Sequence, residues 1–169
     1  MKNIILIIIL TIFSPTLYAM NISTQIKTFN HISITTKNIQ PLLEFYQNKI
    51  GCELLLNGGE RSGKGISDGI GLKDVKMLNY KLRFPNSDVI LELIEMENPK
   101  STEGNKEKIN STGYTHFCLM VNDIDKTYSI LKDNNVKTIS PTVEVAQTKA
   151  KFFYAYDTDG NIIEIVQSP

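Results

Sequence analysis

An internal repeat constrains the fold of this chain more than any other feature. His31 and His116 lie 85 residues apart, and superposing them places FNHI over YTHF. The same offset places Asn38 over Asp123, each followed by isoleucine. The chain has two histidines, and both occupy the same place in the repeat. Duplication of one structural unit is the simplest explanation.

Each half reads as a strand followed by a helix. Asn38 and Asp123 are residues that favour helix starts. After Asn38, apolar residues recur at helical spacing up to Ile50, with Pro41 early and Gly51 just beyond the end. After Asp123, the same spacing links Ile124, Tyr128 and Leu131. The pattern predicts one helix in each half.

Further strands complete each half. In the first half they are expected at 52–56, 77–84 and 89–96, and in the second at 136–140, 142–145, 151–156 and 161–167. The order is therefore β-α-β-β-β twice, which predicts an α+β fold. We expect modules at about 27–97 and 113–168, joined by a polar linker, within one domain that spans 20–169.

The last strands of the two halves share a glutamate. Superposing VILELI on NIIEIV places Glu92 over Glu164. Strand alternation puts each carboxylate between two aliphatic side chains on its own face, so partial burial is expected. A buried carboxylate needs a cation, hydrogen bonds or a proton, and no lysine or arginine occupies a repeat-equivalent position. The alternative is that both glutamates face solvent.

One divalent metal would satisfy all four residues, His31, Glu92, His116 and Glu164. Mixed nitrogen and oxygen ligands suit Zn, Ni, Co, Fe or Mn. Such a site could polarise a carbonyl and stabilise an enediolate, with Glu92 or Glu164 acting as a general base. Two structural core histidines are the alternative. The balanced charge, with no Lys/Arg-rich run, gives no sign of a nucleic-acid partner.

Residues 1–19 have the features of a secretory signal peptide. A lysine precedes the run IILIIILTIF, and a small residue, Ala19, ends the segment. The apolar run is short for a membrane span. We therefore expect cleavage after Ala19, a periplasmic or secreted protein and no stable membrane insertion, with an uncleaved anchor as the alternative. Cys52 and Cys118 are expected to be buried free thiols, although a disulfide is possible in such a compartment.

The segment 57–76 holds six of the ten glycines. It contains Gly58-x4-Gly63-Lys64, but Gly65 follows where a P-loop has Ser or Thr, and 66–69 does not resemble a helix start. A P-loop is therefore rejected. We expect either a flexible loop over the site, with Arg61 or Lys64 available to an anionic substrate, or a solvated surface loop.

Four phrases carry a resemblance to a known family: FNHISITTKNIQPLLEFYQNKIGCEL, LELIEMENP, THFCLMVNDIDKTYSILKDNNV and YAYDTDGNIIEIVQ. They resemble the vicinal oxygen chelate superfamily, which includes glyoxalase I, methylmalonyl-CoA epimerase, fosfomycin resistance proteins, extradiol dioxygenases and bleomycin resistance proteins. The resemblance implies two βαβββ modules that form an open, curved mixed sheet around a metal site. The family's ligand positions fall on His31, Glu92, His116 and Glu164.

The resemblance also implies a function. A glutamate at the position of Glu92 resembles glyoxalase-like lyases and epimerases, which have a metal ligand there. Dioxygenases and fosfomycin enzymes have no metal ligand at that position. We expect an exported, metal-dependent lyase or isomerase that acts on a small carbonyl or hydroxy-carbonyl compound through a metal-stabilised enediolate. Export makes coenzyme A thioesters and glutathione unexpected substrates. The alternatives are a metal-free small-molecule-binding module and an Fe-dependent dioxygenase. The resemblance also allows a homodimer. The site then lies either within one chain or between two chains.

Overall fold

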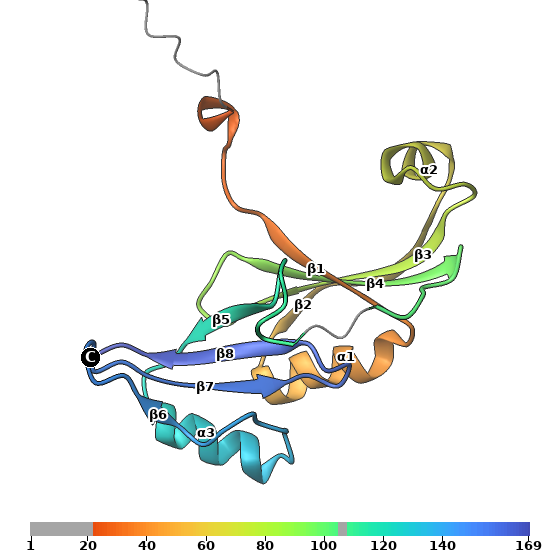
Figure 1. The fold of residues 1–169 in the computed structure, drawn as a ribbon. Coiled ribbons are helices and arrows are strands. Elements are labelled where there is room, and N and C mark those ends of the chain that lie inside the picture. The colour runs from red at the N-terminus through yellow and green to blue at the C-terminus, as the bar shows by residue number, and fades with distance from the viewer. Residues whose placement is uncertain (1–21, 105–107) are drawn as a thin grey trace, which may run out of the picture.

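The structure, a computed structural model, describes residues 22–104 and 108–169, so the predicted signal peptide lies outside the described residues. After a short 3-10 turn (Ser23–Gln25), the chain forms two four-stranded sheets (Figure 1). The first contains β1 (His31–Thr36), β2 (Glu53–Ser62), β3 (Lys76–Arg83) and β4 (Ile90–Asn98). The second contains β5 (His116–Met120), β6 (Val143–Glu144), β7 (Lys151–Tyr156) and β8 (Ile162–Gln167).

Both sheets have the same topology. Their strand orders are β1-β4-β3-β2 and β5-β8-β7-β6. In each sheet the first strand runs parallel to the last, and the other pairs are antiparallel. The predicted α+β fold of two repeated modules is therefore confirmed. Each histidine-bearing strand, β1 or β5, lies at one edge of its sheet.

The predicted helices are also confirmed. α1 (Ile39–Phe45) begins after Asn38, whose side chain accepts a hydrogen bond from the Gln40 N–H. It continues as a π-helical segment, η2 (Tyr46–Ile50), and ends at Gly51, whose φ of 85° is in the left-handed region that glycine favours. α3 (Ile124–Asp133) begins after Asp123, whose carboxylate accepts from the Lys126 N–H.

One hydrophobic core joins the two modules. It contains Leu42 of α1, Leu91 and Leu93 of β4, and Phe153 and Ile163 of the second sheet, all almost fully buried. Because Leu91 and Leu93 flank Glu92 in the strand, the Glu92 side chain must point to the opposite face. The core thus fixes which face of β4 presents the carboxylate.

A buried hydrogen bond links the modules at the edge of this core. The Tyr46 hydroxyl donates to Oδ2 of Asp157 over 2.9 Å. Asp157 also accepts bonds from the backbone N–H of Asp159 and from the backbone and side chain of Asn161. The motif DTDGN therefore forms a tight turn before β8 and ties it to the start of η2.

The glycine-rich segment differs from its predicted form. β2 and β3 extend as a long hairpin, and α2 (Lys64–Ile70) connects them (Figure 1). The segment therefore forms strand and helix where a flexible or surface loop was predicted, and 66–69, which does not resemble a helix start, lies inside α2. The hairpin can continue because Gly58, which has no side chain, lies directly against the ring of Tyr80.

The predicted strand 136–140 is also wrong in detail. It is reduced to an isolated bridge between Thr138 and Ala155, and regular pairing resumes at β6. Pro141, which lacks an N–H, follows the bridge and cannot continue a ladder. None of the helices in the described part of the chain is both long and apolar enough to cross a membrane.

Candidate metal site

The first histidine and the first glutamate face each other. Nε2 of His31, at the start of β1, lies 3.7 Å from Oε2 of Glu92 on β4. The parallel register places Ser33 opposite Glu92, and the Ser33 hydroxyl donates to the same carboxylate over 2.7 Å. All three side chains lie on the face of the sheet that points away from the core.

Glu92 is held by further donors from β3. Its side chain is 14% exposed, Asn79 donates a hydrogen bond to it, and Nζ of Lys81 lies 3.6 Å from Oε1. Burial raises the pKa of Glu92, but the bonds from Ser33 and Asn79, with the charges of His31 and Lys81, outweigh burial and lower that pKa overall. The carboxylate therefore stays ionised at neutral pH.

The second pair repeats this arrangement with different neighbours. Nε2 of His116 on β5 lies 3.3 Å from Oε2 of Glu164 on β8. Cys118 stands opposite Glu164 in the register and hydrogen-bonds to it. Tyr154 of β7 also hydrogen-bonds to Glu164, and its ring makes an edge contact with His116 at 5.4 Å.

The contacts of the two imidazoles indicate which nitrogen faces each carboxylate. Nδ1 of His31 lies 2.7 Å from Oδ1 of Asn30, and Nδ1 of His116 lies 2.9 Å from the Thr115 hydroxyl. Partners at Nδ1 orient a histidine and leave Nε2 as the coordinating atom. An unprotonated Nε2 and a carboxylate oxygen are both hydrogen-bond acceptors and cannot bond to each other directly. A proton or a metal cation between the two atoms would satisfy both. The donor set fits a divalent metal on this ground.

The four predicted ligands are brought together as two pairs and not as one set. Among the described residues, no group of three or more His, Cys, Asp or Glu side chains lies close enough to hold one metal ion. Each module therefore presents a half-site: His31 and Glu92 form the first, and His116 and Glu164 form the second. Structural and catalytic zinc sites usually have at least three protein ligands.

The two cysteines are both free thiols, as expected. Cys52 is buried, which raises its pKa to about 12. Cys118 is exposed and not buried as predicted. Desolvation and then the neighbouring Glu164 raise the pKa of Cys118 to about 11. Both thiols are therefore protonated at neutral pH, and neither is an activated nucleophile.

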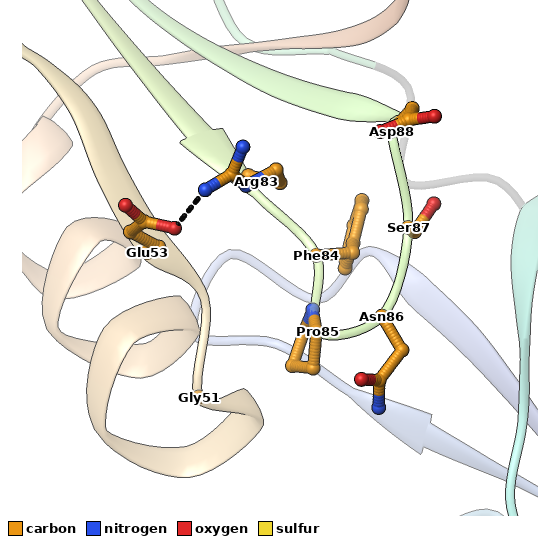
Figure 2. Close-up of a pocket in the computed structure, with 8 residues that line it drawn as sticks. All are labelled: Gly51, Glu53, Arg83, Phe84, Pro85, Asn86, Ser87 and Asp88. Atoms are coloured by element: carbon orange, nitrogen blue, oxygen red, sulfur yellow. Dashed lines mark hydrogen bonds and ion pairs between the residues drawn. The ribbon is translucent and has the colours of Figure 1, made fainter.

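Three surface hollows beside the described strands contain neither half-site; the third, of about 700 Å³, lies at Lys76, Glu95 and Glu97. The first, of about 520 Å³, lies at the turn between β3 and β4, where Arg83 pairs with Glu53 (Figure 2). The second, of about 490 Å³, follows β1 between the modules and is lined by residues 32–38, 102–104, 114–115, 117 and 158–162. Ser33 connects the second hollow to Glu92.

Three neighbours of the half-sites, Asn79, Lys81 and Tyr154, were missed by sequence reasoning. They occupy strands that carry no ligand, and they reach the glutamates only through strand register. Lys81 stands opposite Glu92, and Tyr154 stands opposite Glu164. Lys81 also supplies a positive charge beside the Glu92 carboxylate. The second module has no such cation, because Tyr154 occupies the position equivalent to Lys81. Aligning the two repeats through their third strands would have identified both residues.

The fold agrees with comparisons to known proteins. The model of the Glyoxalase/Bleomycin resistance protein/Dioxygenase superfamily matches residues 28–165. The crystal structure of a glyoxalase family protein from Bacillus cereus superposes with a TM-score of 0.75 at 18% identity, over 85% of this chain and 95% of that one. At this identity the superposition shows the shared fold.

Two curated relatives are similar over most of their length. The metallothiol transferase FosB of Staphylococcus epidermidis is 28% identical over 143 residues, which are 83% of this chain and 84% of the relative. The mitochondrial methylmalonyl-CoA epimerase of Dictyostelium discoideum is 27% identical over 139 residues, which are 80% of this chain and 75% of the relative.

Proposed function

Because the chain belongs to the Glyoxalase/Bleomycin resistance protein/Dioxygenase superfamily, we propose that it is a metal-dependent lyase or isomerase acting on a small carbonyl or hydroxy-carbonyl compound. The observation that carries this proposal is the repeated His–Glu pair, in which each Nε2 faces a carboxylate oxygen. A relative named as an epimerase and another named as a metallothiol transferase support metal-assisted chemistry on small molecules.

In this proposal His31, Glu92, His116 and Glu164 hold one divalent metal, either Zn, Ni, Co, Fe or Mn. When bound, such a metal polarises a carbonyl oxygen and stabilises negative charge that develops there. Both glutamates are candidate bases. Glu92 is fixed by Ser33, Asn79 and Lys81, which lower its pKa and make it a weaker base than an ordinary glutamate. Glu164 is therefore the residue that we assign to removing the proton next to the carbonyl.

We propose that a second copy of the chain completes the site. The two pairs lie on separate sheets, and their histidine strands β1 and β5 are edge strands. Phe29 and Tyr114, which precede these strands at repeat-equivalent positions, are 65% and 68% exposed. Exposed aromatic side chains beside unpaired strand edges are typical of surfaces that another chain covers. The first half-site of one copy would then meet the second half-site of its partner.

We also propose that the protein acts outside the cytoplasm, as residues 1–19 suggest. The substrate would then be a compound of the periplasm or the surroundings of the cell, and not a coenzyme A thioester. Expression with its own leader, followed by N-terminal sequencing of the mature protein, tests this proposal. A mature chain that begins at Met20 is expected, and a chain that retains Met1 in the cytoplasm would contradict export.

Elemental analysis tests the metal proposal. We expect about one metal ion per complete set of four ligands in the chain beginning at Met20, and loss of that metal in His116→Ala and Glu164→Gln. Glu144→Gln is the matched control, because Glu144 is an exposed carboxylate that pairs with Lys149 away from both half-sites. Absence of metal after reconstitution would contradict the proposal and favour the metal-free binding module. Oxygen consumption with Fe(II) and a catechol would favour the dioxygenase.

A further inference from the structure

We infer that the substrate is a small amphipathic monoanion. One singly charged acid group, such as a carboxylate, would meet Lys81, and an apolar or aromatic substituent would lie against Tyr154 and Phe152. This inference rests on the proposed function, since it concerns the substrate class of the same site. The inference depends on a difference between the two modules in the residues that surround the four ligands, because the ligands themselves are the same in both.

The asymmetry lies in the third strand of each module. On β3, Lys81 stands opposite Glu92, and Asn79, two residues earlier, lies on the same face. On β7, the equivalent position opposite Glu164 is Tyr154, and Phe152, two residues earlier, lies on the same face. One half-site therefore has a cation and an amide beside its glutamate, and the other has two aromatic rings.

The charges around the first half-site favour the binding of one anion. A divalent cation would neutralise Glu92 and Glu164, while the ammonium of Lys81 would lose Glu92 as its main counterion. Lys81 is 36% exposed and is the one lysine or arginine among the described residues within 4 Å of either glutamate. With neutral histidines the loaded set carries one net positive charge. A monoanion bound beside Lys81 would compensate it.

The second half-site provides an apolar surface. The rings of Phe152 and Tyr154 are in edge contact at 5.7 Å, and Met120, 72% exposed, stands on the other side of Val166 from Phe152. The nearby cation of this module, Lys137, lies over the ring of Tyr156 at 5.2 Å and not at Glu164. A flat or aliphatic group would bury apolar area against these rings.

Ligand binding to the Co²⁺-loaded chain from Met20 tests this inference, with the visible absorption of Co²⁺ as readout. Mandelate carries both an acid group and a ring, mandelamide lacks the charge, and lactate lacks the ring. We expect mandelate to bind about tenfold more tightly than either analogue. Lys81→Met should remove the preference for mandelate over mandelamide, and Lys81→Arg should retain most of it. Phe152→Ala should reduce the preference for mandelate over lactate.

Lys76→Met is the matched control, because Lys76 is also on β3 and also pairs with glutamates, Glu60 and Glu97, but lies away from the half-sites. It should bind all three compounds as the wild type does. Equal affinity of the wild type for mandelate and mandelamide would overturn the inference and leave the proposed function intact. Failure of the wild type to bind Co²⁺ would instead overturn the proposed function and this inference with it.

Discussion

At the scale of single residues, the buried contact between Tyr46 and Asp157 makes a testable contribution to stability. Asp157, only 6% exposed, has a pKa that burial raises, although Asn161, Tyr46 and Asp159 donate hydrogen bonds that oppose the increase. A raised pKa means that folding favours the protonated form. The contribution of Asp157 to the free energy of unfolding is therefore fully present at low pH and falls as pH rises through that raised pKa.

Tyr46→Phe tests this contact. Loss of the hydroxyl leaves the buried carboxylate with one donor fewer, so we expect the free energy of unfolding to fall by about 1.5–3 kcal/mol at neutral pH. The loss should be smaller below the usual aspartate range, where Asp157 is protonated. Denaturant titrations at both pH values measure it. Tyr128→Phe is the control, since its ring packs on Phe153 and the substitution preserves that contact. An equal loss at both pH values would refute the assignment.

At the scale of secondary structure elements, the β2–β3 hairpin depends on one glycine. A Cβ at Gly58 would lie 2.1 Å from an atom of the Tyr80 ring, which is far inside contact distance. We expect Gly58→Ala to lower the free energy of unfolding by about 1–3 kcal/mol, because the ring must move. In Gly65→Ala of α2 a Cβ meets nothing within 4 Å, so stability should be unchanged or slightly higher. Thermal unfolding of both variants measures the two changes in stability. An equal change in Gly58→Ala and Gly65→Ala would contradict the role assigned to Gly58.

The elements also show how far the sequence could be interpreted. Apolar spacing and the cap residues Asn38 and Asp123 were sufficient for both helices, because these are local signals. The strand 77–84 was predicted, but the extension of β2 beyond Leu56 was missed, since it depends on a close approach of Gly58 to the Tyr80 ring that is not visible in the sequence. The repeat located all four candidate ligands. It did not locate Lys81, because the second module has a tyrosine at that position.

At the scale of the whole molecule, the repeat places two equivalent half-sites on two sheets of one chain. The shared core and the Tyr46–Asp157 hydrogen bond hold the modules in this arrangement. Moving the half-sites together within one chain would require disruption of that core, which is costly. Completing them with a second chain requires only contact between exposed surfaces. A two-fold dimer would form two identical sites, because each copy supplies a first and a second half-site.

The most direct measurement is the metal content of mixed variants. His31→Ala and His116→Ala should each bind no metal alone. When they are co-refolded in equal amounts, random pairing should restore about one quarter of the wild-type metal content, because half of the dimers contain one intact site. Co-refolding either variant with the double variant is the control and should restore none. Recovery of about one quarter would support a site shared between copies, and no recovery from the mixture would contradict it.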